Sequence, residues 1–182
     1  MLLSGKPPDG FCAAHLNMND ARIRESFHRK RLNKHHADRN TLIIDELGLK
    51  HGKCRADIAV INKYLIGYEI KSNADSLCRL DQQIATYSRV FDHASIVVGT
   101  KHIDRVRTRV PEWWGIIATY QGHRGEVSFE TIRASRMNKD IDPLSIAQLL
   151  WSNEAIEILS DFGVPAKVLQ RKRLFLYQQL VE

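Results

Sequence analysis

The sequence contains few cysteines and no long apolar run, and both absences narrow the classes of protein it can represent. The three cysteines among its 182 residues, Cys12, Cys54 and Cys78, are an odd number at wide spacing. That pattern provides neither a disulfide framework nor a zinc-ligand motif, and it favours a reducing compartment. No stretch approaches the roughly 18 apolar residues of a membrane span, and the first residues lack the apolar segment of a signal peptide. We therefore expect a cytoplasmic protein with no membrane partner.

Positive charge is what the sequence has in excess. Lysine and arginine total 27 against 21 acidic residues, which leaves a net charge of +6. Hydrophobic residues make up 43% and charged residues 26%, values close to those of ordinary globular domains. The charge balance suits a polyanionic partner such as nucleic acid, although many basic proteins bind no anion.

The apolar patterns predict a mixed α/β fold. Helical spacing favours helices over 20–33, 76–92, 103–110 and 143–160, with a shorter one after Pro165. Strand patterns cover 41–47, 55–61, 64–72, 94–99, 114–120 and 127–132. The second and third strands are joined by so short a link that they should pair as an antiparallel hairpin. We expect three parts, namely a loose arm over 1–18, an α/β domain over 19–132 and a C-terminal helical extension over 133–182 packed on that domain.

Charged residues interrupt two neighbouring apolar strands. Alternation along the third strand places Glu69 and Lys71 on one face, and the hairpin should bring Asp57 close to them. Isolated buried charges are costly, and two clustered carboxylates repel each other unless a cation compensates. Oxygen ligands of this kind suit Mg²⁺ or Mn²⁺. The alternative is a structural salt bridge between Lys71 and one of the two carboxylates.

This arrangement resembles a known superfamily. Asp57, then Glu69-Ile70-Lys71, then a helix bearing Gln83-x-x-x-Tyr87, are similar to the PD-(D/E)xK nucleases. The Gln-x-x-x-Tyr element resembles the RecB-like branch, and the compact hairpin resembles Holliday-junction resolvases. A bacterial family of small members is similar over RADIAVIN, GYEIKS, YSRVFD, VVGTKH and VPEWWG. The resemblance covers about residues 20–120, and Ala56 stands where the superfamily's name has proline.

The resemblance implies a restriction-endonuclease-like mixed sheet with an αβββαβ core, and an enzyme that hydrolyses phosphodiester bonds in DNA. Such a Mg²⁺- or Mn²⁺-dependent deoxyribonuclease would serve repair, recombination, mobile elements or defence. The implied catalytic residues are Asp57, Glu69, Lys71, Gln83 and Tyr87. The implied metal ligands are Asp57, Glu69, the backbone carbonyl of Ile70, and either Glu46 or Glu25.

We expect DNA as the partner, whether duplex, branched or single-stranded. The sequence leaves open whether the protein forms a homodimer. The proposed DNA contacts are Arg55, Arg29, Lys30, Arg31, Lys101 and Arg105, and the basic segment around 167–173 could add to them. Arg55 points with Asp57 and could instead pair with Glu46. Two other readings stay open: a catalytically inactive nuclease-fold module that binds DNA or a partner, and an interaction protein whose charged trio is only a salt bridge.

Overall fold

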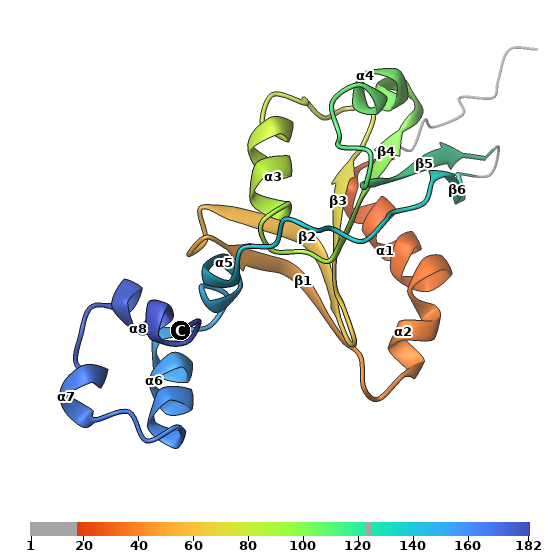
Figure 1. The fold of residues 1–182 in the computed structure, drawn as a ribbon. Helices are drawn as coiled ribbons and strands as arrows, with labels where there is room; N and C mark the ends of the chain where they lie inside the picture. The colour runs from red at the N-terminus through yellow and green to blue at the C-terminus, as the bar shows by residue number, and fades with distance from the viewer. Residues whose placement is uncertain (1–17, 123–124) are drawn as a thin grey trace, which may run out of the picture.

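The computed structural model describes residues 18–122 and 125–182, so the expected arm over 1–18 lies outside the described residues except for its last position. One six-stranded sheet forms the centre of the protein, with its strands in sequence order (Figure 1). The strands are β1 (Leu42–Leu49), β2 (Cys54–Ile61), β3 (Leu65–Lys71), β4 (His93–Gly99), β5 (Gly115–Gln121) and β6 (Val127–Arg133).

Helices cover the sheet and extend beyond it. Those of the first part are α1 (Asp20–Arg31), α2 (Asn33–Ala37), α3 (Leu80–Tyr87), the 3-10 turn η1 (Thr100–His102) and α4 (Ile103–Arg107). The later ones are α5 (Pro143–Ala147), α6 (Ser152–Asp161), α7 (Ala166–Leu169) and α8 (Arg173–Gln179). Pairing is antiparallel for β1–β2–β3 and β5–β6 but parallel for β3–β4–β5. The expected mixed α/β sheet with an antiparallel front is therefore confirmed.

Two apolar cores lie on the two faces of the sheet. Ile66, Tyr68 and Ile70 of β3 pack into the core beneath α1, whereas Leu65 faces the core that contains Tyr87 of α3. Because strand side chains alternate faces, Glu69 and Lys71 belong to the α3 side, as the sequence pattern predicted. The alternation thus carries two charged groups toward an otherwise apolar layer.

Helix α1 is capped and then fastened to the far edge of the sheet. The Asn19 side chain accepts a hydrogen bond from the Arg22 amide at 3.0 Å, which satisfies one of the free donors of the first turn. Further along, Lys30 donates to the Val127 carbonyl at 2.6 Å and Arg31 to the Thr131 hydroxyl at 2.7 Å. These two cations therefore help to hold α1 against β6.

The helix expected over 76–92 was wrong in extent, because α3 begins only at Leu80 and ends at Tyr87. Before it, the Asp75 carboxylate accepts from the Ser72 amide at 2.7 Å, and Ser76 Oγ accepts from the Cys78 amide at 3.2 Å. Such local side-chain bonds offer the backbone an alternative to a helix. The segment 72–79 is consequently a loop beside the end of β3.

The single helix expected over 143–160 was also wrong. Helix α5 ends at Ala147, and α6 starts after Trp151, whose backbone is extended with φ −71° and ψ 155°. The Trp151 amide donates to the Glu154 carboxylate at 2.6 Å, which starts the second helix separately. The apolar pattern runs across the break because both helices pack into one small core, so periodicity alone could not reveal it.

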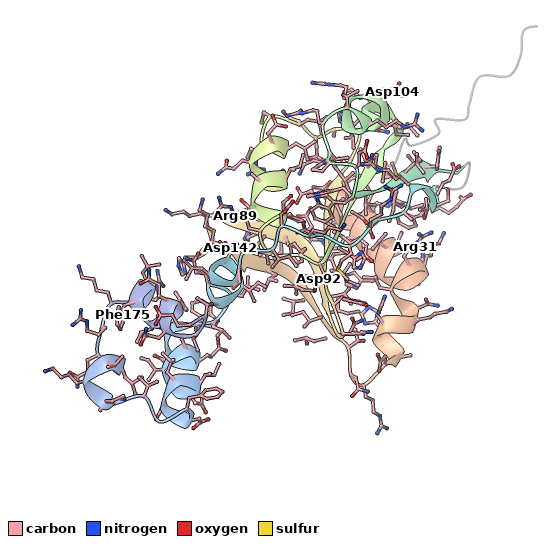
Figure 2. All side chains as sticks on the ribbon, in the orientation of Figure 1. Arg31, Arg89, Asp92, Asp104, Asp142 and Phe175 are labelled. Atoms are coloured by element: carbon pink, nitrogen blue, oxygen red, sulfur yellow. The ribbon has the colours of Figure 1, made fainter. Side chains whose placement is uncertain are left out.

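The helices α5–α8 form a separate cluster beside the sheet, as Figure 1 shows. Their small core contains Ala147, Ala155 and Tyr177. The connection to the α/β part includes an ion pair between Arg89 and Asp142, both labelled in Figure 2, with 3.8 Å between Arg89 Nη1 and Asp142 Oδ2. Within the described part of the chain, no helix is long and apolar enough to cross a membrane.

Candidate functional site

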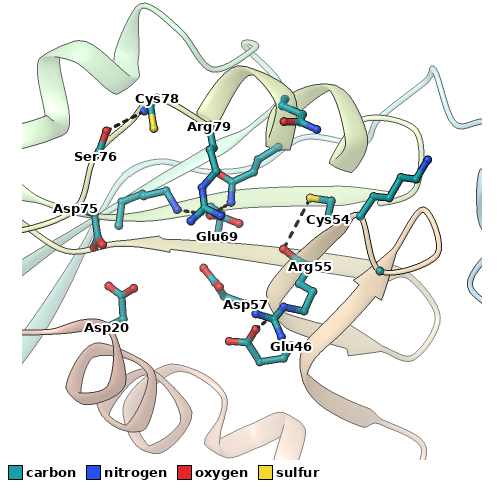
Figure 3. A pocket seen from close by; sticks show the side chains of 15 residues that line it. Asp20, Glu46, Cys54, Arg55, Asp57, Glu69, Asp75, Ser76, Cys78 and Arg79 are labelled. Carbon is teal, nitrogen blue, oxygen red and sulfur yellow. Dashed lines mark hydrogen bonds and ion pairs between the residues drawn. The ribbon is translucent and has the colours of Figure 1, made fainter.

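A pocket opens where β2 and β3 separate. Their ladder ends at the pair Ile58 and Tyr68, and beyond it Asp57 Oδ2 accepts a hydrogen bond from the Ile70 amide at 2.6 Å. A side chain thus replaces the backbone partner, and the strands diverge around a cavity of about 470 Å³ (Figure 3). The hairpin that the sequence predicted therefore brings Asp57 and Glu69 to one pocket.

The first strand contributes an unusual residue to this pocket. Glu46 has φ +56°, in the left-handed region that residues with a Cβ seldom adopt, and the β1–β2 ladder skips it between the pairs Asp45–Ile58 and Leu47–Ala56. Its carboxylate forms an ion pair with Arg24 and another with Arg55, in which Arg55 Nε lies 3.2 Å from Glu46 Oε2. The pairing of Arg55 with Glu46, which the sequence left open beside a DNA contact, is thus present. Strained backbone of this kind often occurs at functional sites.

Glu69 lies at the bottom of the pocket and is completely buried. Lys71 Nζ and Gln83 Nε2 both donate to its Oε1, and Tyr87 Oη donates to its Oε2 at 2.7 Å. Although burial disfavours the ammonium form, the Glu69 carboxylate raises the pKa of Lys71 above its ordinary value. Gln83 and Tyr87 are four positions apart on α3 and so reach the same group. The structure therefore brings these four predicted residues together as one hydrogen-bonded cluster.

Three aspartates converge at the mouth of the pocket from three elements. Burial, then the neighbouring Glu69 carboxylate, raise the pKa of Asp57 to about 6. Burial and a hydrogen bond with the Asp75 carboxyl group raise the pKa of Asp20 to about 6. Burial also acts on Asp75, but hydrogen bonds from Ser72 and Asp20 hold its pKa below the usual value. Of these two carboxyl groups, Asp20 therefore holds a proton more tightly than Asp75 does.

Two oxygen atoms of the pocket are buried without a hydrogen-bond partner, namely Asp20 Oδ1 and Gln83 Oε1. Carboxylate and amide oxygens of this kind are the donors that Mg²⁺ prefers. In residues 18–122 and 125–182, however, no group of three or more His, Cys, Asp or Glu side chains is already arranged to hold a metal ion. The oxygen donors are therefore of the type that Mg²⁺ binds, but the described side chains are not arranged around one metal position.

Positive side chains surround the acidic interior. The exposed cations that line the pocket are Lys53, Arg55 and Arg79, and Lys71 lies deeper. Of the other expected DNA contacts, Lys30 and Arg31 are engaged with β6, and Lys101 donates to the Asn73 carbonyl at 3.4 Å. Arg29 and Arg105 are exposed but do not line the pocket. Of the six expected DNA contacts, only Arg55 therefore lines the pocket.

Sequence reasoning missed several residues of this site. Asp20 and Asp75 line the pocket together with Glu46, whereas Glu25 is exposed and does not line it. Asp20 is the first residue of α1, and nothing in a linear sequence says which turn of that helix faces β2. A turn motif at Ser72–Asp75 was the available signal for Asp75, since Ser and Asp three positions apart commonly bond to each other's backbone.

The comparison with known families decides where this chain belongs. The family described as bacteriophage P4 protein cII matches residues 19–180. The chain belongs to that family. One member, Protein cII of Enterobacteria phage P4, is 30% identical over 122 residues, which are 67% of this chain and 46% of that protein. The chain therefore spans about half the length of this relative. No solved structure matches the chain.

This membership corrects the nuclease interpretation. The expected place in the PD-(D/E)xK superfamily, the Mg²⁺-dependent deoxyribonuclease activity and the hydrolase role were wrong, since the matching family is the cII family. The physical reason is that an Asp with a Glu-x-Lys triplet on a hairpin is too short a pattern to specify one family. Here both oxygens of Glu69 are already bonded to Lys71, Gln83 and Tyr87. The salt bridge that was left open as the alternative is present.

Proposed function

We propose that this member of the phage P4 cII family binds DNA through the phosphate backbone at the pocket between β2 and β3. The observation that carries the proposal is the distribution of charge there. Exposed cations border the opening, while carboxylates lie at its mouth and bottom. Cations along the rim suit a phosphate backbone, because each phosphate contact releases a condensed counterion. Those contacts position DNA without reading its sequence.

We propose that a divalent cation, Mg²⁺ or Mn²⁺, binds in the acidic interior of the pocket together with DNA. Asp20 and Asp57 are the groups that we expect to hold it, because each carboxylate is repelled by a neighbouring carboxylate and Asp20 Oδ1 has no hydrogen-bond partner. Bound Mg²⁺ commonly keeps several waters and shares its remaining positions with phosphate oxygens. The cation would thus join an acidic pocket to an anionic ligand. Glu69 would keep its present hydrogen-bond partners Lys71, Gln83 and Tyr87.

We propose further that the backbone plan is that of restriction-endonuclease-like proteins. The order of the elements from α1 to β4 supports this, since it is αβββαβ apart from the short helix α2. The likeness concerns the backbone plan alone and assigns no hydrolytic activity. The proposed pocket binds DNA and does not cleave it. The proposed compartment for this binding is the cytoplasm.

The test is fluorescence anisotropy with a labelled duplex of about 30 base pairs, titrated with the whole chain at several salt concentrations. Binding should weaken as salt rises, with a slope of roughly −0.9 for each phosphate contacted. Adding Mg²⁺ to protein prepared in EDTA should tighten binding. A denaturing gel of the same samples checks that the duplex stays intact.

The matched variants are Asp57→Asn in the pocket and Asp104→Asn on the exposed surface of α4. Asp57→Asn should abolish the effect of Mg²⁺, whereas Asp104→Asn should leave it as in the parent protein. The absence of DNA binding at low ionic strength, with or without Mg²⁺, would show that the proposed function is wrong. If Mg²⁺ leaves DNA binding unchanged in all three proteins, the cation is not part of the function.

A further inference from the structure

A second concentration of positive charge lies on the C-terminal helices. Between Asp161 and Glu182 the chain carries four cations and no acidic residue. These cations, all exposed, are Lys167, Arg171, Lys172 and Arg173. None of the ion pairs found among the described residues includes any of them. We call this set the C-terminal cationic surface.

The backbone that carries this surface is held in place. Tyr177 of α8 is fully buried against Ala155 and Ala147, and its hydroxyl donates to the Leu150 carbonyl at 2.8 Å. Arg171 lies over the Phe175 ring, with 5.2 Å between its guanidinium carbon and the ring centroid. Figure 2 labels Phe175 within this helical cluster. A cation held by a ring loses less conformational entropy on binding an anion than a free side chain does.

The C-terminal cationic surface lies close to the pocket. The His51 ring stacks on Tyr177, with centroids 5.5 Å apart. Arg173 lies four positions before Tyr177 in α8 and therefore on the same side of that helix, and His51 precedes Lys53 by two residues in the turn. In agreement with this placement, partial burial and then the positive charges of Arg173 and Lys53 lower the pKa of His51. Lys53 in turn lines the pocket. Positive charge therefore continues from the pocket rim, through the β1–β2 turn, to α8.

The turn that makes this connection is itself strained. Lys50 and His51 have φ values of +51° and +58°, and Gly52 follows with +79°. Two successive residues with a Cβ in this region are uncommon and persist where tertiary contacts hold them. The stacking of His51 on Tyr177 is such a contact. It fixes the turn between the pocket and the helices.

We propose that the C-terminal cationic surface is a second contact for the backbone of duplex DNA, continuous with the pocket through Lys53. This inference rests on the proposed function, and it extends the binding site from one pocket to a track along two parts of the molecule. Duplex DNA suits the surface because it offers regularly spaced charges over the length of such a track. RNA and acidic polypeptides are the alternatives that the experiment separates.

The test compares two variants of the full chain that lose the same four charges at different places. The first carries Lys167→Gln, Arg171→Gln, Lys172→Gln and Arg173→Gln. The control carries Lys34→Gln, Arg39→Gln, Lys63→Gln and Lys139→Gln, all exposed positions that do not line the pocket. Circular dichroism and thermal unfolding verify that both variants are folded.

The readout is the slope of the logarithm of the DNA-binding constant against the logarithm of salt concentration. The first variant should lose about two to four units of slope, because each lost phosphate contact removes roughly 0.9. The control variant should keep a slope close to that of the parent protein. Competition with polyglutamate and with duplex RNA, at equal charge concentration, should displace the labelled DNA less effectively than unlabelled duplex DNA.

The outcomes distinguish this inference from the function on which it rests. If the parent protein does not bind DNA, the proposed function fails. If the parent binds and the first variant retains the parent's slope, or the two variants lose slope equally, the pocket remains a binding site and the second contact is refuted. Equal displacement by RNA or by polyglutamate would refute the preference for duplex DNA.

Discussion

At the scale of single residues, the arrangement around Glu69 shows how a carboxylate is kept inside an apolar layer. Its two oxygens have three donors, which come from β3 and α3. A buried charged group without such donors would cost several kcal/mol. Each donor therefore contributes to the stability of the fold, whatever ligand the pocket binds.

Replacing Tyr87 by Phe tests this contribution. Tyr87→Phe leaves Glu69 Oε2 without its donor, and we expect the free energy of unfolding to fall by about 1–3 kcal/mol. The matched control is Tyr120→Phe, since Tyr120 Oη donates to Glu130 Oε2 at 2.8 Å on an exposed part of the sheet. The control should lose less than about 0.5 kcal/mol. Urea unfolding measures both, and equal losses would contradict the role given to burial.

The pH dependence of stability should report on Asp57. Its pKa of about 6 lies above the ordinary value of 3.8, so the folded protein binds the proton more tightly than the unfolded chain does. The stability that protonation supplies is complete below about pH 4 and is lost as the pH rises through 6. In EDTA, Asp57→Asn should remove this loss and stabilise the protein at pH 7 by about 1–3 kcal/mol.

The measurement is urea unfolding at intervals from pH 4 to 8, with Asp104→Asn as the exposed control. The control should follow the profile of the parent protein. An Asp57→Asn variant whose stability falls between pH 4 and 6 as steeply as the parent's would contradict the assignment. Asp20 titrates in the same range and should leave a shallower dependence in the variant.

At the scale of elements, close packing between β3 and the segment that follows α3 positions the pocket. A Cβ atom added at Gly67 would lie 2.7 Å from ring atoms of Phe91, a separation that real Cβ atoms do not show. Strand β3 can therefore approach the α3 layer only because this residue has no side chain. The approach brings Glu69, two residues further on, within reach of Tyr87.

We expect Gly67→Ala to lower the free energy of unfolding by about 1–3 kcal/mol, because the added methyl group overpacks the layer. Gly48→Ala is the matched control in β1, where an added Cβ would meet only Gly52 backbone atoms at 3.9–4.0 Å. The control should change stability by less than about 0.5 kcal/mol. Thermal and urea unfolding give both values, and a Gly67 variant as stable as the control would refute the packing argument.

At the scale of the whole molecule, the sheet and the C-terminal helices have separate cores. The sheet core lies on both faces of β3, β4 and β5, whereas α5–α8 surround a small core of their own. Small cores are less stable than large ones, and contiguous units of low stability open before the whole molecule unfolds. The two parts should therefore differ in their opening free energies.

Hydrogen exchange should show that difference. Amides of β4 should exchange only on global unfolding, whereas those of α6 and α8 should exchange through an opening of lower free energy. Mass spectrometry of peptic peptides at several urea concentrations separates the two, since a partial opening exposes less surface and depends less on urea. Identical opening free energies and urea dependences in β4 and α6 would show that the cores form one cooperative unit.

The sequence by itself determined the sheet and much of the site, because strand alternation is a local property of the backbone. Periodicity of two placed Glu69 and Lys71 on one face, and the short link after Ile61 predicted the hairpin that brings Asp57 toward them. Helical spacing placed Gln83 and Tyr87 on one face of α3. These predictions needed only the geometry of single elements.

Tertiary structure decided which other charged residues reach the site, because local sequence patterns do not specify contacts between distant elements. It placed Asp20 and Asp75 in the pocket with Asp57 and left Glu25 outside that pocket. It engaged Lys30 and Arg31 with β6, and it stacked His51 of the β1–β2 turn on Tyr177 of α8. A charged side chain can bind a ligand, pair within the fold or face water, and only the packing of the elements around it selects among these.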